Sequence, residues 1–195
     1  MVSSSTESCL GVILAGGLSS RMGQDKATLM RGNVDMLSFT KQRLIEAGMH
    51  RVAVSGDQYD VADRYPQMGP VGGILSVIEQ YQPSSMLIMP IDLPLITASA
   101  IQHLKTLGAL THQACCYQQH QLPLYLPVNG YLELALLRLR KTMLAANQGK
   151  GPSIKQLLND LPHQSIVCPQ PSLLFNSNTP QQWQQVQQQW LTTSS

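Results

Sequence analysis

Strand-like and helix-like patterns alternate through the first 110 residues, and this order restricts the possible folds more than any other feature. Short apolar runs predict three strands, over 10–15, 51–55 and 86–89. Apolar residues recur at helical spacing in three further segments, over 35–47, 70–81 and 97–107. This alternation implies right-handed βαβ units and a largely parallel α/β sheet.

Residues suited to ligand binding stand at the ends of the predicted strands. Gly16 and Asp92 come shortly after the first and third strands, and Ser55 ends the second. In an open parallel sheet the ligand crevice lies beyond the carboxyl ends of the strands. We therefore expect these three residues to meet at one crevice, although they are far apart in the sequence.

The second half of the chain has weaker patterns. Two short strands are predicted over 114–117 and 122–126, and Pro123 and Pro127 place the second near a sheet edge. Apolar spacing predicts helices over 132–143 and 154–161. Further strands are expected over 165–168 and 173–175.

A helix is expected at the end of the chain. Thr179, Pro180 and Gln182 have the order of an N-cap, a first helical residue and a capping box. The segment is rich in glutamine, which also suits a disordered tail. Trp183 and Val186 are three residues apart, however, and Trp190 follows at helical spacing, so we favour a docked amphipathic helix.

The composition is that of an ordinary globular protein. Of the 195 residues, 43% are hydrophobic, and a formal net charge of +2 argues against nucleic acid or a membrane as partner. We expect one domain over 9–195 in a cytoplasmic protein, after a disordered polar segment over 1–8 that lacks the features of a signal peptide. The four cysteines form no C-x-x-C pair, which indicates reduced, buried thiols.

The loop after the first strand combines glycine with positive charge. Gly16 and Gly17 allow a close approach of the backbone to an anion, and Arg21 and Lys26 add two charges suited to phosphate. The loop is neither a P-loop nor a G-x-G-x-x-G dinucleotide motif. The alternative is a glycine turn followed by solvated charges.

Asp92 stands between Pro90 and Pro94, which restrict the backbone and fix the direction of the carboxylate. Next to a phosphate site, a carboxylate in this position is a natural Mg²⁺ ligand, because Mg²⁺ is commonly held by one or two carboxylates together with phosphate oxygens. The alternative is an aspartate that makes a turn or caps the next helix.

The segment from Leu14 to Lys26 reads L-A-G-G-x-x-x-R-M-G-x-D-K and resembles the molybdenum cofactor guanylyltransferase family. The resemblance implies a three-layer, Rossmann-like nucleotidyltransferase fold with a mostly parallel mixed sheet. It assigns the catalytic role to Arg21 and Lys26, and it assigns nucleotide binding to Leu14, Ala15, Gly16, Gly17 and Lys26.

Further segments extend the resemblance. Pro90-Ile91-Asp92-Leu93-Pro94 is similar to the family's P-C-D-x-P, which implies that Asp92 binds metal and nucleotide. Ser55 stands where relatives often carry an Asn near the base. Asp63 precedes a segment similar to the family's G-P-L-x-G-[IL], which implies contact with the nucleotide; a solvated loop acid is the alternative.

Near the C-terminus, the segment 175–180 resembles the family's F-x-N-x-N-T-P. Asn176 and Asn178 are therefore candidate substrate residues, and the alternative is that they only complete the loop and the helix start. His120 lies where relatives have a substrate-side segment, although a surface histidine is the simpler interpretation.

The function that the resemblance implies is transfer of GMP from GTP to molybdopterin, with Mg²⁺ as cofactor. The terminal phosphate of molybdopterin attacks the α-phosphate of GTP, and pyrophosphate leaves. Gly17 favours GTP, since cytidylyl-transferring relatives tend toward L-A-A-G. Implied partners are GTP, molybdopterin, and cofactor-biosynthesis and molybdoenzyme-chaperone proteins. The alternatives are a cytidylyl or sugar-phosphate nucleotidyltransferase on the same fold and a catalytically silent nucleotide-binding regulator.

Overall fold

The computed structural model describes residues 9–15, 26–145, 151–177 and 179–193. The segment 1–8, which we expected to be disordered, lies outside the described residues. None of the helices in the described stretches combines the length and the apolar character needed to cross a membrane.

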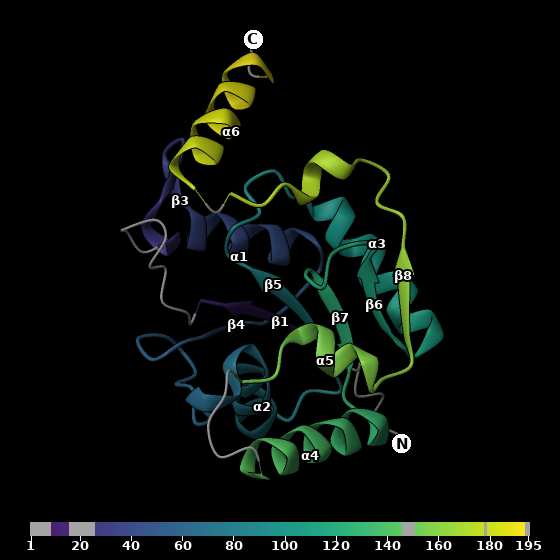
Figure 1. Ribbon diagram of the computed structural model, residues 1–195. Coiled ribbons are helices and arrows are strands. Elements are labelled where there is room, and N and C mark those ends of the chain that lie inside the picture. Colours follow the sequence, from purple (N-terminus) through teal and green to yellow (C-terminus); the bar gives the residue numbers. More distant parts are fainter. Residues whose placement is uncertain (1–8, 16–25, 146–150, 178, 194–195) are drawn as a thin grey trace, which may run out of the picture.

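Six strands form the central sheet (Figure 1). Their spatial order is β4 (Val52–Ser55), β1 (Cys9–Leu14), β5 (Ser85–Pro90), β7 (Leu124–Pro127), β6 (Ala114–Tyr117) and β8 (His163–Ile166). β1 pairs in parallel with β4 and β5, β8 pairs in parallel with β6, and β7 runs antiparallel to both of its neighbours. The predicted mostly parallel mixed sheet is therefore confirmed.

Helices cover both faces of the sheet, as Figure 1 shows. One face carries α1 (Met36–Glu46), α3 (Ala98–Thr111) and α6 (Pro180–Thr193). The other carries α2 (Gly69–Tyr81), α4 (Gly130–Ala145) and α5 (Ile154–Asn159). Three short 3-10 helices, η1 (Lys26–Thr28), η2 (Pro66–Met68) and η3 (Pro171–Leu174), and a hairpin of β2 (Met30–Arg31) and β3 (Val34–Asp35) complete the described fold.

Alternation along the strands builds the two cores. In β5, Leu87 and Met89 belong to the core under α1 and α3, whereas Met86 and Ile88 belong to the core under α2 and α4. All four side chains are fully buried, which explains why the strand reads as a continuous apolar run. Cys115 and Cys116 divide between the same two cores, and all four cysteines are buried and free, as predicted.

Several helix ends match their sequence patterns. Thr97 accepts a hydrogen bond from the N–H of Ala100 and caps α3. Thr179 and Gln182 form the reciprocal bonds of a capping box, at 3.0 and 3.2 Å. Trp183 and Val186 are buried, so the docked amphipathic helix is confirmed. The side chain of Trp190 lies outside the described residues.

Three expectations were wrong. β7 lies inside the sheet and not at its edge, because Pro123 precedes the strand and Pro127 is its last residue. The segment 173–175 contains the end of η3 and forms no strand. The strand expected over 165–168 begins two residues earlier, at His163.

Candidate nucleotide and metal site

The carboxyl end of β1 lies between the two segments that were expected to join it. Leu14, its last residue, pairs with Ser55 of β4 on one side and with Pro90 of β5 on the other. The N–H of Ala15 donates to the Ser55 carbonyl at 2.9 Å. The predicted phosphate loop therefore begins beside Ser55 and beside Pro90, which precedes Asp92 by two residues in the sequence.

The rest of this loop is only partly described. Gly16, Gly17 and Arg21 lie outside the described residues. Lys26 begins η1, but its side chain also lies outside them.

The Pro90–Pro94 loop is tied to two distant parts of the chain. The carbonyl of Asp92 accepts a 3.1 Å hydrogen bond from the N–H of Ser177, which is buried. The carbonyl of Pro94 accepts a 2.8 Å hydrogen bond from Nε of Arg31. The backbone at the predicted metal ligand and two residues after it is thus held by residues that are far away in sequence.

A cavity of about 340 Å³ opens beside Asp92. Four segments line it: 90–93 after β5, 119–122 between β6 and β7, 153–155 at the start of α5, and Asn176. The structure therefore brings the predicted substrate residue Asn176 and the suggested His120 to Asp92. The second predicted substrate residue, Asn178, lies outside the described residues.

Lys155 also lines this cavity, although no pattern in the sequence had pointed to this residue. It follows Ser153, whose hydroxyl and backbone N–H form a capping box with Gln156 that fixes the start of α5. No sequence motif contains this lysine. Before the fold is known, it cannot be distinguished from any solvated lysine near the start of a helix.

The donor set around Asp92 suits a cation shared with a bound phosphate. Among the described residues, no group of three or more His, Cys, Asp or Glu side chains is arranged to hold a metal ion. Asp92 and Asn176, whose side chains carry one carboxylate and one amide, are instead among the residues that line the cavity. Mg²⁺ commonly takes few protein oxygens and completes its shell with phosphate and water.

Ser55, expected near the base, and Asp63, expected to contact the nucleotide, meet two consecutive glycines of α2. A β-carbon on Gly73 would lie 2.8 Å from Ser55 Oγ, and one on Gly72 would lie 3.1 Å from Asp63 Oδ1. Ser55 is only 3% exposed. Both polar groups therefore reach this end of the sheet because the first turns of α2 carry no side chain there.

The loop carrying Asp63 also contains two other acids with structural bonds. Asp60 Oδ2 accepts from the N–H of Val54 at 2.9 Å and so supports β4. Asp63 Oδ1 accepts from the N–H of Tyr65 at 2.8 Å. The N–H of Asp63 donates to Asp57 at 3.4 Å. These bonds fix the loop beside the start of α2.

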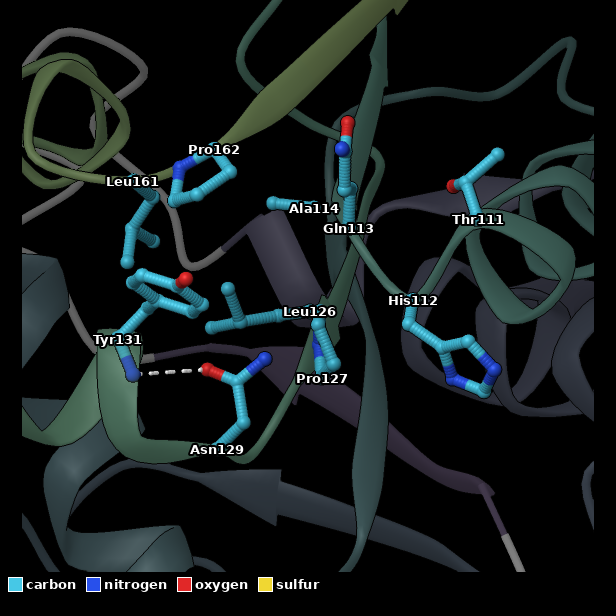
Figure 2. Close-up of a pocket in the computed structure, with 10 residues that line it drawn as sticks. All are labelled: Thr111, His112, Gln113, Ala114, Leu126, Pro127, Asn129, Tyr131, Leu161 and Pro162. Atoms are coloured by element: carbon cyan, nitrogen blue, oxygen red, sulfur yellow. Dashed lines mark hydrogen bonds between the residues drawn. The ribbon is translucent and has the colours of Figure 1, made fainter.

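Figure 2 shows a second cavity, of about 230 Å³, at the opposite edge of the sheet. It lies where β6 begins and β7 ends, and Asn129 beside it accepts from the N–H of Tyr131 at 3.1 Å. The residues that the structure shows lining it include no lysine, arginine or carboxylate. Its position and lining therefore do not suit a triphosphate.

Comparison with known proteins gives a consistent family. Residues 11–164 match the model of the MobA-like NTP transferase domain. The molybdenum cofactor guanylyltransferase of Xanthomonas euvesicatoria pv. vesicatoria is 34% identical over 179 residues, which cover 89% of this chain and 91% of that protein. A probable molybdenum cofactor guanylyltransferase of Trichormus variabilis is 28% identical and covers 87% of this chain and 86% of its own length.

The fold is also shared with a protein of solved structure. The crystal structure of molybdopterin-guanine dinucleotide biosynthesis protein A from Archaeoglobus fulgidus superposes with a TM-score of 0.73 at 16% identity, covering 94% of this chain and 100% of that one. At this identity the likeness concerns the fold alone, which is the three-layer nucleotidyltransferase fold that the sequence predicts. With the domain match and the 34% relative, these findings show that the chain belongs to the MobA-like NTP transferase family.

Proposed function

We propose that this protein transfers GMP from GTP to molybdopterin and releases pyrophosphate. The observation that carries the proposal is the meeting of the β1 end, the Asp92 loop and a polar cavity at one sheet edge. The names of the related guanylyltransferases support the choice of substrates. We also propose that residues 9–195 act as one domain, in the cytoplasm.

The nucleotide is bound along β1. Leu14, Ala15, Gly16 and Gly17 offer backbone groups to GTP, and Arg21 and Lys26 hold the triphosphate through their positive charge. Ser55 and Asp63 face the base and ribose from the α2 side. As the α-phosphate is attacked, Arg21 and Lys26 stabilise the negative charge that builds up on the departing pyrophosphate.

Enzymes of this family generally depend on a divalent metal, and we propose Mg²⁺ with Asp92 as its protein ligand. When bound, Mg²⁺ neutralises phosphate charge at the reacting centre. The backbone that carries Asp92 is held by the bonds from Ser177 to the Asp92 carbonyl and from Arg31 to the Pro94 carbonyl.

The acceptor occupies the cavity beyond Asp92. Asn176 and Asn178 offer amides to the pterin, and the terminal phosphate of molybdopterin points toward the α-phosphorus of GTP. A phosphate oxygen forms the new bond to this phosphorus, and the bond to the β-phosphate oxygen breaks with its electron pair. The nucleophile is already anionic, so the protein needs no general base, and its contribution is positioning and charge neutralisation.

The proposal is tested by measuring pyrophosphate release from GTP or CTP, with molybdopterin or sugar phosphates as acceptor. We expect release only with molybdopterin and Mg²⁺, with GTP preferred over CTP, and loss of most activity in Asp92→Asn. A preference for CTP or for a sugar phosphate would replace the proposed substrates. Tight GTP binding that needs no Mg²⁺ and releases no pyrophosphate would favour a regulatory protein.

A further inference from the structure

We propose that Arg31 is a positioning residue that holds the Asp92 loop in the geometry required for metal-assisted nucleotide binding. This inference rests on the proposed function of Asp92. Arg31 ends β2, five residues after Lys26, and its Nε donates at 2.8 Å to the carbonyl of Pro94, which lies 63 residues further along the chain. The bond joins the segment that leaves the phosphate loop to the loop that carries the metal ligand.

The position of the Arg31 guanidinium is itself restricted. It lies over the ring of Phe39 in α1, with the Cζ atom 4.3 Å from the ring centroid. Phe39 is 6% exposed and belongs to the core between the sheet and α1. Stacking on a buried ring restricts the guanidinium to few orientations, so the bond to Pro94 has a fixed starting point.

The Asp92 loop is held at the carbonyl of Asp92 itself and again two residues later. Ser177 donates to the Asp92 carbonyl at 3.1 Å, and Arg31 donates to Pro94 two residues later. A protein group that holds a metal ion must keep its position within about 0.5 Å for productive binding, and contacts from the residues around it supply that precision. Loss of the Arg31 bond therefore releases one of these two anchors while the carboxylate itself remains.

Arg43 provides a matched control. Its Cζ atom lies 5.3 Å from the centroid of the same Phe39 ring, and its guanidinium forms a salt bridge with Glu46 at 2.7 Å on α1. Arg31→Met and Arg43→Met both remove a cation from this ring, but only the first removes the bond to Pro94. Arg31→Lys keeps the charge and one donor, and it serves as the conservative variant.

The experiment measures the dissociation constant of GTP by calorimetry, with saturating Mg²⁺ and with EDTA. The ratio of the two constants is the gain in GTP affinity from Mg²⁺. We expect Arg31→Met to lower this gain about tenfold, Arg31→Lys to restore part of it, and Arg43→Met to stay within about twofold of the wild type. Thermal unfolding checks that each variant is folded.

A double-mutant cycle separates positioning from a general structural effect. If Arg31 acts through Asp92, the gain is lost in Asp92→Asn and Arg31→Met reduces it no further in that background. An unchanged gain in folded Arg31→Met, or equal losses in both Asp92 backgrounds, would overturn the inference. If the wild-type protein shows no Mg²⁺-dependent GTP binding, the proposed function fails instead.

Discussion

Lys26 begins η1 directly after the phosphate loop, and the proposed reaction depends on its charge. We predict that Lys26→Ala lowers the turnover number at least about tenfold, which corresponds to roughly 1.4 kcal/mol of transition-state stabilisation. Lys141, an exposed residue of α4, is the control, and Lys141→Ala should leave turnover unchanged. Turnover of Lys26→Ala equal to that of the control would reject the role of Lys26.

Asn176 is the described residue that links the C-terminal motif to the Asp92 cavity. We predict that Asn176→Ala raises the KM for molybdopterin about fivefold, the effect of losing one hydrogen bond of about 1 kcal/mol, and leaves the KM for GTP unchanged. The exposed Asn159 at the end of α5 is the matched control. Steady-state kinetics with each substrate varied in turn gives both constants, and an equal rise in both would contradict a role on the acceptor side.

The sequence revealed some of these residues and not others. Asp92 stood out because prolines flank it and a buried strand precedes it. Arg31 and Lys155 have no such neighbours, and their positions depend on contacts across 63 residues and on a cavity built from four segments. A basic residue without a local pattern can be assigned only after the chain is folded.

At the scale of elements, α2 approaches the neighbouring loop closely because Gly72 has no side chain. A β-carbon there would lie 2.2 Å from the carbonyl oxygen of Tyr65, which is backbone and cannot turn away. We predict that Gly72→Ala lowers the free energy of unfolding by about 1–3 kcal/mol, as overpacking of a core does. Urea unfolding measures this change.

The control for this substitution is Gly130 in the first turn of α4, where a β-carbon would meet nothing within 4 Å. Gly130→Ala should be neutral or stabilise the protein by about 0.4–1 kcal/mol, because alanine restricts the unfolded chain. If both variants unfold at the same urea concentration, the close approach of α2 does not constrain the fold.

The errors in predicting elements have physical reasons. Proline disturbs a ladder only where a backbone N–H is needed. Pro123 precedes the paired residues of β7, and Pro127 is the last of them, opposite Ser85, so the strand can lie inside the sheet. The apolar segment 173–175 is too short for its sequence to distinguish a strand from a 3-10 turn, and its first two residues are in fact the end of η3. The β2–β3 hairpin pairs only two residues on each side, too few for an alternating pattern.

At the scale of the whole molecule, the parallel pairing of β1, β4 and β5 could be predicted from the sequence. The way in which later segments of the chain meet the same end of the sheet could not. The alternation of elements predicted that Gly16, Ser55 and Asp92, which stand at the ends of the strands, would meet at one crevice. The register brings the strand ends Leu14, Ser55 and Pro90 to one edge, as that prediction requires. The antiparallel insertion of β7 then places the 119–122 turn beside Asp92. Strand order of this kind depends on long-range packing that periodicity does not encode.

Tyr117 joins the sheet to the helical layer and makes the stability of the whole molecule sensitive to high pH. It is fully buried in β6, and its hydroxyl donates to the carbonyl of Ala100 in α3 at 3.0 Å. Burial raises the pKa of Tyr117 to about 12, and burial likewise raises the pKa of the neighbouring Cys115 to about 11. In the unfolded chain both groups lose their protons at lower pH, near 10 and 9.

The free energy of unfolding therefore keeps its full value below pH 9 and decreases as the pH rises toward 12. It decreases because the two groups lose their protons in the unfolded chain at a lower pH than in the folded protein, which stabilises the unfolded state. We predict a fall in the free energy of unfolding of at most about 1.4 kcal/mol per pH unit for each group. Tyr117→Phe should cost about 1 kcal/mol at pH 8 through the lost hydrogen bond but flatten the decrease between pH 10 and 12. The control Tyr131→Phe, at a residue that is 63% exposed, should change neither. Urea unfolding across this pH range measures how steeply the free energy of unfolding falls with pH in each protein. If this fall is as steep in Tyr117→Phe as in the wild type, ionisation of the buried phenol does not cause the pH dependence of stability.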